Sequence, residues 1–372
     1  MNWIDRLRRR LLTRDNAIVF CVTFTLLLGV NFALVYTAPS FAHRLPFDVV
    51  RLISPCYRSF IYTDPTRMPD RPRFEVVLGD SFAEGGGDEW LSSDPRYGLF
   101  NKLEPDDRRQ FISFARSGYG AIGTVLEEQR CQRLLEQRTS LGLAREAVSH
   151  LTFVFYEGND LNDVLMEQHR RSSAAKYNAR FLLPVFDYAY RKLRSGRDDA
   201  SADGPDAGVP MADYPRSASG VTLGDYPQSA AMELTEDDID LALDALTRSL
   251  ATVEARYPGR QLQFLYIPSV ASSYDFRGRL KTQSYAGLPY FQTTGEVNRH
   301  RHDHLRDRVS AAVVALGWQF CDASEALRVQ TSAGAPVHGP RDWQHLNKRG
   351  YAILAERYTE CFGGVRPRDT PT

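Results

Sequence analysis

The sequence predicts an α/β domain built around a parallel sheet of about five strands. Short apolar runs bounded by turn residues suit the buried strands of such a sheet. Five runs of this kind occur, at residues 74–78, 110–115, 151–156, 262–267 and 318–321. Helical patterns separate them and close the chain, at residues 122–139, 237–257, 297–316 and 348–361. Strands that alternate with helices are typical of a parallel sheet covered by helices.

An apolar run near the N-terminus predicts one transmembrane helix over residues 17–37. It has no charged side chain between Ala17 and Tyr36, and five arginines precede it. Twenty helical residues rise about 30 Å, enough to cross the hydrocarbon core of a bilayer. By the positive-inside rule, residues 1–16 form a cytoplasmic basic tail, and the rest of this single-pass protein of the cell inner membrane faces the periplasm or exterior. A cleaved signal peptide is the alternative, because residues 40–42 resemble a small-residue cleavage site.

The chain beyond the apolar run divides by composition. Residues 38–72 are rich in Pro and Arg and are interpreted as a stalk, whereas residues 73–363 carry the α/β pattern. Within this domain, residues from about 195 to 231 are rich in Ser, Asp, Gly, Pro and Ala, which predicts a flexible insertion. Residues 166–193, which are aromatic and basic, are expected to form helices that cover the functional site. Residues 364–372 are expected to be a disordered tail.

The charge and cysteine content argue against nucleic-acid binding and against a metal site. The chain has 46 basic and 46 acidic residues, so no overall basic field favours nucleic acid as a partner. Four cysteines follow the apolar run and allow one or two disulfides, with three full pairings: Cys56, Cys131, Cys321 and Cys361. No CxxC pair occurs, and the histidine-rich stretch 299–304 is interpreted as a solvated helix start, so we expect neither metal nor cofactor.

Small polar residues and glycines follow the predicted strands, at the edge where parallel sheets bind ligands. Ser81 comes after the first strand, Gly118 after the second and Asn159 after the third. Near the C-terminus stand Asp342 and His345, a spacing that places both side chains on one face of a turn. Taken singly, each is explained by capping or turn formation. Their joint occurrence indicates one functional site.

These residue types suit nucleophilic catalysis. A serine hydroxyl needs a base, and an imidazole titrates in the right range. The imidazole in turn needs a carboxylate that fixes its tautomer, as Asp342 would for His345. An oxyanion forms during acyl transfer and needs preorganised donors. The backbone N–H groups of Ser81 and Gly118 and the side-chain amide of Asn159 are the candidates.

The segments Gly79-Asp80-Ser81, Gly118, Gly158-Asn159-Asp160 and Asp342-x-x-His345 resemble, in order, the four sequence blocks of SGNH (GDSL) hydrolases. The resemblance runs from about residue 74 to 360, apart from the insertion. It implies a flavodoxin-like three-layer α/β/α sandwich, with Ser81 as nucleophile, His345 as base and Asp342 as its orienting partner. Gly118 and Asn159 are implied as oxyanion donors. Many relatives carry Asn five residues before the second-block glycine, where this chain has Ser113.

The resemblance and the predicted anchor together favour an extracytoplasmic serine esterase. Its expected substrates are acyl esters of envelope or exported polysaccharide, and acetyl esters are favoured among them. The acyl group would be carried on Ser81 as an acyl-enzyme. Three alternatives remain open: an O-acyltransferase with a sugar acceptor, a lipid esterase whose residues 181–190 form an apolar lid, and a non-catalytic glycan-binding protein. The glycine-rich stretch 84–88 lacks a following Lys-Ser/Thr pair and is interpreted as a flexible rim of the site.

Overall fold

The structure, a computed structural model, describes residues 18–19, 21–30, 33, 73–87, 103, 109–138, 145–169, 215–224, 226–283 and 291–363. Within this part, all residues from 73 onward belong to one compact unit, and the helical residues 18–33 belong to another. The predictions for the basic tail, the stalk, the covering helices beyond residue 169 and the C-terminal tail lie outside the described residues.

Five parallel strands form the central sheet, as the sequence predicts. They are β1 (Arg73–Gly79), β2 (Arg109–Ser113), β3 (Val148–Tyr156), β4 (Gln261–Ile267) and β7 (Gln319–Asp322). Their order across the sheet is β2-β1-β3-β4-β7, and every neighbouring pair is parallel. The chain order reverses direction between β1 and β3, so the carboxyl ends of these two strands flank the switch point where such sheets bind ligands.

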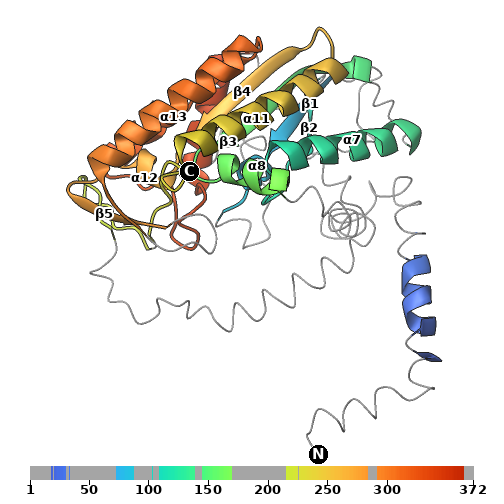
Figure 1. The fold of residues 1–372 in the computed structure, drawn as a ribbon, viewed down its shortest axis with the longest axis horizontal. Helices are drawn as coiled ribbons and strands as arrows, with labels where there is room; N and C mark the ends of the chain where they lie inside the picture. Colours follow the sequence, from blue (N-terminus) through green and yellow to red (C-terminus); the bar gives the residue numbers. More distant parts are fainter. Residues whose placement is uncertain are drawn as a thin grey trace, which may run out of the picture. The chain divides into compact units, whose positions relative to one another are not determined.

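Helices cover both faces of this sheet. One group comprises α7 (Ala121–Arg138), α8 (Asp160–His169) and α11 (Glu236–Arg256), which contact one another and lie in front of the strands in Figure 1. On the other face, strand residues Val77, Val154 and Leu265 form one core cluster with residues of α14 (Ser324–Ser332) and α15 (Lys348–Phe362). Because side chains alternate along a strand, the two helix groups lie on opposite faces. The result is the expected three-layer α/β arrangement.

The remaining elements include the short helices α4 (Ser81–Glu84) and α12 (Val270–Ser273) and the 3₁₀ turn η5 (Arg145–Ala147), which lie next to strand ends. The long helix α13 (Gly295–Ala315) packs against β7 and α11 (Figure 1). A two-stranded antiparallel sheet, formed by β5 (Arg279–Thr282) and β6 (Phe291–Thr294), precedes α13 and has no counterpart in the sequence prediction. Its strands have four residues each, too short to give a periodic signal.

The prediction of a flexible insertion over residues 195–231 is wrong for its described C-terminal part. Leu223, Ala230 and Ala231 are fully buried, and residues 215–224 and 226–231 belong to the folded unit. Main-chain hydrogen bonds attach the segment to the domain, for example from Ala271 N–H to the Gln228 carbonyl at 2.8 Å. The segment is ordered with few apolar residues because its backbone polar groups form hydrogen bonds within the fold. Composition alone does not reveal these hydrogen bonds.

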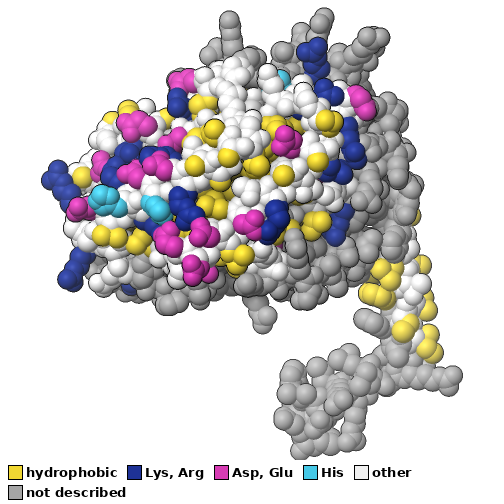
Figure 2. All heavy atoms as spheres, turned by 45° about the horizontal axis from the view of Figure 1, so that its top comes forward, with side chains coloured by type: hydrophobic (Ala, Val, Ile, Leu, Met, Phe, Trp, Pro, Cys, Tyr) yellow, Lys and Arg dark blue, Asp and Glu magenta, His cyan; other side chains and the backbone are white. Residues whose placement is uncertain are grey.

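The N-terminal helix is described by itself. Residues 18, 19, 21–30 and 33 are helical, and their side chains are largely exposed and apolar, as the yellow side chains in Figure 2 show. In the part of the chain that the structure describes, no helix combines the length and apolar character needed to cross a bilayer.

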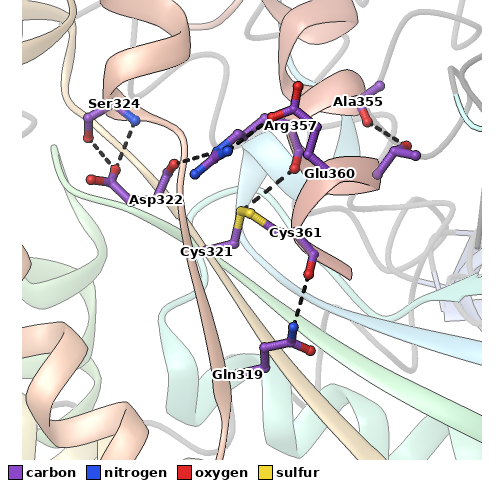
Figure 3. Close-up of a disulfide and its surroundings, with 9 residues drawn as sticks. Gln319, Cys321, Asp322, Ser324, Ala355, Arg357, Glu360 and Cys361 are labelled. Carbon is purple, nitrogen blue, oxygen red and sulfur yellow. Dashed lines mark hydrogen bonds and ion pairs between the residues drawn. A yellow bond between two sulfur atoms is a disulfide. The ribbon is translucent and has the colours of Figure 1, made fainter. Parts of the chain in front are cut away.

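A disulfide joins Cys321 of β7 to Cys361 of α15, across a sequence separation of 40 residues (Figure 3). The contacts around it fasten the same two elements. Gln319 Nε2 donates to the Cys361 carbonyl at 2.9 Å, and Arg357 Nε donates to the Asp322 carbonyl at 3.0 Å. Cys131 is also disulfide-bonded. This edge strand is therefore covalently tied to the last helix of the domain.

Removing the Cys321–Cys361 bridge should lower the free energy of unfolding by about 4 kcal/mol, because closing a loop of this length restricts the unfolded chain. The double variant Cys321→Ala/Cys361→Ala should show this in urea titrations followed by circular dichroism. Cys21→Ala, which removes an exposed free thiol, is the matched control and should unfold at the wild-type midpoint. Equal midpoints for the double variant and the control would contradict the prediction.

Candidate active site

The nucleophile candidate lies where β1 turns into α4. Asp80 is the N-cap of α4 and accepts the Phe82 N–H at 2.8 Å, so Ser81 becomes the first helical residue. The turn requires Gly79, whose φ is +141° and whose Cβ, if present, would lie 2.6 Å from the Val154 carbonyl oxygen. Ser81 is thus held at the carboxyl end of a central strand, where the residue is only 6% exposed.

The structure brings Ser81, His345 and Asp342 together, although 264 residues separate the serine from the histidine. His345 Nε2 lies 2.8 Å from Ser81 Oγ, and His345 Nδ1 lies 2.7 Å from Asp342 Oδ2. The other Asp342 oxygen accepts the N–H groups of Gln344 at 3.0 Å and His345 at 3.2 Å, which fixes the carboxylate in its own turn. With Asp342 on Nδ1, the neutral imidazole presents an unprotonated Nε2 to the serine.

The glycine-rich stretch after α4 packs against this histidine. A Cβ on Gly86 would lie 3.1 Å from His345 Cδ2, and one on Gly87 would lie 2.6 Å from the Leu346 carbonyl oxygen. The Tyr351 hydroxyl donates to the Gly86 carbonyl at 2.7 Å. Residues 84–87 therefore line the site as expected, but the prediction that this rim is flexible is wrong for them. Small residues occur here because the histidine loop needs the space.

The pKa values of His345 and Asp342 are shifted in the directions that a catalytic base and its carboxylate partner require. Burial lowers the pKa of His345, but the hydrogen bond and charge of Asp342 outweigh it, so the pKa is raised above 6.5. Burial raises the pKa of Asp342, yet the contacts with His345 and two backbone N–H groups lower it overall. Asp342 thus remains a carboxylate while the imidazole titrates above its ordinary range. An imidazolium formed during a reaction would be stabilised by the same carboxylate.

This geometry predicts the pH dependence of catalysis. Only the neutral imidazole accepts a proton, so kcat/KM for an ester should rise with pH through a midpoint above 6.5. Initial rates with p-nitrophenyl acetate across the pH range, corrected for spontaneous hydrolysis, provide the measurement. A wild-type midpoint below 6.5 would contradict the assignment of His345 as the base.

Asp80 gives the serine proton a second acceptor. Ser81 Oγ lies 3.2 Å from Asp80 Oδ2, and Asn159 Nδ2 donates to the same oxygen at 3.3 Å. Asp80 is fully buried, and this burial raises the pKa of its carboxyl group. No role for Asp80 was predicted from the sequence. Asp80 could have been predicted as a site residue because it is a carboxylate directly beside Ser81.

The candidate oxyanion donors lie on loops next to the end of β1. Asn159 follows β3, and its side-chain amide reaches the residue beside Ser81. Gly118 occupies the third position of a turn closed by the Tyr119 N–H and the Arg116 carbonyl at 3.1 Å, and its φ of +73° suits glycine there. Arg116 N–H also donates to the Gly79 carbonyl at 3.2 Å, which ties this turn to the strand that precedes Ser81.

Ser113, at the position where many SGNH hydrolases carry Asn, is accommodated within this loop. Its hydroxyl accepts the Ala115 N–H at 3.2 Å, and the side chain is buried. The residue therefore supports the chain at the end of β2 through a local hydrogen bond. This departure leaves the turn that carries Gly118 intact.

The histidine-rich stretch contains one residue that the sequence interpretation missed. His302 lies within α13 and is fully buried, so the prediction of a solvated helix start is wrong for it. Its Nδ1 lies 2.7 Å from Glu157 Oε1, and Glu157 also accepts the Tyr266 hydroxyl and the Ser269 N–H. The charge of His302 lowers the pKa of Glu157 to about 2 despite its burial. This pair joins the ends of β3 and β4 to α13, beneath the Asn159 loop.

Within the described part of the chain, no group of three or more His, Cys, Asp or Glu side chains is arranged to hold a metal ion.

Comparison with known proteins finds solved structures that resemble this chain at low identity. No family model matches the chain, and no curated protein matches it. Similar solved structures include an extracellular lipase from Streptomyces rimosus (14% identity, TM-score 0.38, 78% of this chain and 99% of that one). Others are a phospholipase A1 from Streptomyces albidoflavus (17%, 0.38, 78% and 99%) and a catalytic mutant of an acetylxylan esterase from Geobacillus stearothermophilus (10%, 0.34, 80% and 96%). Because these identities and TM-scores are low, we base the functional proposal on the site geometry.

Proposed function

We propose that this protein is an SGNH-type serine esterase in which Ser81, His345 and Asp342 form the catalytic triad. The observation that carries the proposal is the chain of two short contacts, Ser81 Oγ to His345 Nε2 and His345 Nδ1 to Asp342 Oδ2. The three side chains come from distant segments, and each segment is held by its own hydrogen bonds. Such an arrangement matches the roles of nucleophile, base and orienting carboxylate.

In the proposed reaction, Ser81 Oγ attacks the acyl carbon while its proton passes to His345 Nε2. The carbonyl oxygen becomes an oxyanion, which accepts hydrogen bonds from the N–H groups of Ser81 and Gly118 and from the Asn159 amide. Collapse of the intermediate breaks the bond to the alcohol, which leaves with the proton held by His345. Water then attacks the acyl-enzyme with the same proton transfers, which releases the acid and regenerates Ser81.

Asn159 has to change its partner during this cycle. In the free protein its amide donates to Asp80, the residue beside Ser81. The amide is thereby held near Ser81 before substrate binds. Donors that are already in place require little reorganisation in the transition state, which is the physical basis of their contribution.

The substrate class and location that we propose follow from the sequence. The apolar, positively flanked segment 17–37 favours an inner-membrane anchor with the domain outside the cytoplasm. The proposed substrates are small acyl esters, preferentially acetyl esters, of envelope or exported polysaccharide. Transfer of the acyl group to a sugar hydroxyl uses the same acyl-enzyme and is the second candidate, because only the final acceptor differs.

The test is an acyl-chain series with and without a sugar acceptor. Purified protein is assayed with the acetyl, butyryl and octanoyl esters of p-nitrophenol, and the acetyl ester is repeated with an acetyl-free oligosaccharide. We expect the highest rate of hydrolysis with the acetyl ester, with release of free acetate. Acetylated oligosaccharide in place of acetate would favour the transferase, and preference for the octanoyl ester would favour the lipid esterase. Absence of turnover with all three would contradict the proposed function.

A further inference from the structure

The turn that carries Gly118 is bonded to the helix that carries the nucleophile. The backbone N–H of Ser117 donates to Glu84 Oε2 at 2.8 Å, and Glu84 is the last residue of α4, the helix that begins with Ser81. A carboxylate hydrogen bond to a backbone N–H is about twice as strong as a neutral one. This contact fixes one side of the turn relative to the nucleophile.

A second carboxylate holds the other side of the same turn. Glu167 of α8 accepts the Gly120 N–H at 2.9 Å and the Gly123 N–H at 3.0 Å, both at the start of α7. The approach depends on glycine. A Cβ on Gly120 would lie 2.9 Å from Glu167 Oε2, and a Cβ on Gly123 would overlap Glu167 Oε1. The two glycines thus leave room for one buried carboxylate to bind two N–H groups.

Side-chain packing does not hold Gly118 itself. The residue is exposed, and a Cβ built on it would meet no atom within 4 Å. The position of its N–H therefore depends on how the neighbouring backbone is held. That backbone is bonded to Gly79 through Arg116, to Glu84 through Ser117 and to Glu167 through Gly120.

We propose that Glu84 and Glu167 are positioning residues that hold the Gly118 N–H in place to stabilise the oxyanion. The inference rests on the proposed esterase function and extends it to two residues outside the four sequence blocks. They act through the backbone and touch neither the substrate nor the reacting atoms. Their loss should slow the chemical step and leave substrate binding nearly unchanged.

The ionisation of Glu167 sets the assay conditions. Burial raises the pKa of this carboxyl to about 7, with a further contribution from the charge of Asp163 on the same helix, while the backbone N–H groups of Gly120, Gly123 and Ile122 oppose the rise. The charged form that accepts two N–H bonds is therefore fully populated only above neutral pH. Assays at about pH 8.5, above the pKa of Glu167, keep its carboxylate charged.

The experiment measures kcat and KM for p-nitrophenyl acetate in six variants of the full chain. Loss of an oxyanion donor typically costs about 10²- to 10³-fold in kcat. Displacement of the Gly118 N–H should cost somewhat less, so we expect kcat to fall about 10- to 100-fold in Glu84→Ala and Glu167→Ala. KM should stay within about twofold. Glu84→Gln keeps an acceptor for Ser117 and should retain nearly wild-type kcat. Gly123→Ala, which pushes the Glu167 carboxylate away, should lower kcat like Glu167→Ala.

The double variant Gly123→Ala/Glu167→Ala should be no slower than the slower single variant, because both changes break the same contact. Glu128→Gln is the matched control: it alters a buried carboxylate of α7 that binds Arg256 and Tyr257 and no backbone N–H of the turn. This control should lower the unfolding midpoint without changing kcat. Should Glu167→Ala fail to fold, Glu84→Ala and Glu84→Gln still decide the outcome.

Three results would overturn the inference. An active wild-type protein whose Glu84→Ala and Glu167→Ala variants keep wild-type kcat would exclude the positioning role and leave the esterase function intact. Losses that multiply in the double variant would show that Gly123 and Glu167 act separately, which contradicts the proposed contact. A wild-type protein without esterase activity would overturn this inference together with the function on which it rests.

Discussion

Ser81→Ala should reduce ester hydrolysis by at least about 10⁴-fold, which corresponds to roughly 5.5 kcal/mol in the activation barrier. The variant removes the only atom that we assign to bond with the acyl carbon, and the remaining His345–Asp342 pair cannot form an acyl-enzyme. The fold should persist, because the Ser81 side chain contributes two hydrogen bonds, to His345 and Asp80. The measurement is kcat/KM for p-nitrophenyl acetate, with circular dichroism as the check on folding.

Ser249→Ala is the matched control for this substitution. Ser249 is a buried serine of α11 whose hydroxyl donates to the Ala245 carbonyl at 2.8 Å, away from the site. This variant should keep wild-type activity at a slightly lower unfolding midpoint. Turnover by Ser81→Ala at more than about one hundredth of the wild-type rate would remove Ser81 from the mechanism.

Asp342→Asn should lower kcat by about 10⁴-fold while leaving the local turn in place. The asparagine oxygen can still accept the N–H groups of Gln344 and His345, as Asp342 Oδ1 does at 3.0 and 3.2 Å. Its NH₂ group would then face His345 Nδ1 and force the imidazole proton onto Nε2. An imidazole protonated at Nε2 cannot accept the proton of Ser81, so the serine would lose its base.

Asp322→Asn separates this effect from loss of a turn carboxylate. Asp322 accepts the Ser324 N–H at 2.8 Å, two residues along the chain, as Asp342 does with Gln344. Both variants should lose similar stability, and only Asp342→Asn should lose activity. Comparable kcat values for the two variants would mean that Asp342 supports the turn alone.

The sequence predicted the central sheet well because each strand carries its own signal. β3 and β4 are buried on both faces and appear in the sequence as continuous apolar runs, whichever strands lie beside them. The positions of Ser81 and Asn159 could be predicted for a related reason, since each directly follows such a strand. That Asp342 and His345 meet Ser81 was inferred from the order of the four blocks, which the resemblance supplied.

The features that the sequence did not reveal depend on contacts between distant segments. Glu167 lies on a helix with other acidic residues, and only the fold places it against the glycines of α7, 44 and 47 residues earlier in the chain. His302 lies among exposed charged residues in the sequence, yet the face of α13 that it occupies is buried against Glu157. Composition also concealed the packing of residues 226–231, whose few apolar side chains gave no periodic pattern.

The central claim, that Ser81 is an activated nucleophile in a formed triad, is tested most directly by covalent labelling. The folded protein is treated with a fluorophosphonate at about pH 8, digested, and analysed by mass spectrometry, with Asp342→Asn treated in parallel. We expect one phosphonylated peptide, modified at Ser81, and a much slower reaction in the variant. An unmodified Ser81 in the folded wild-type protein, or equal labelling of all serines, would contradict the claim.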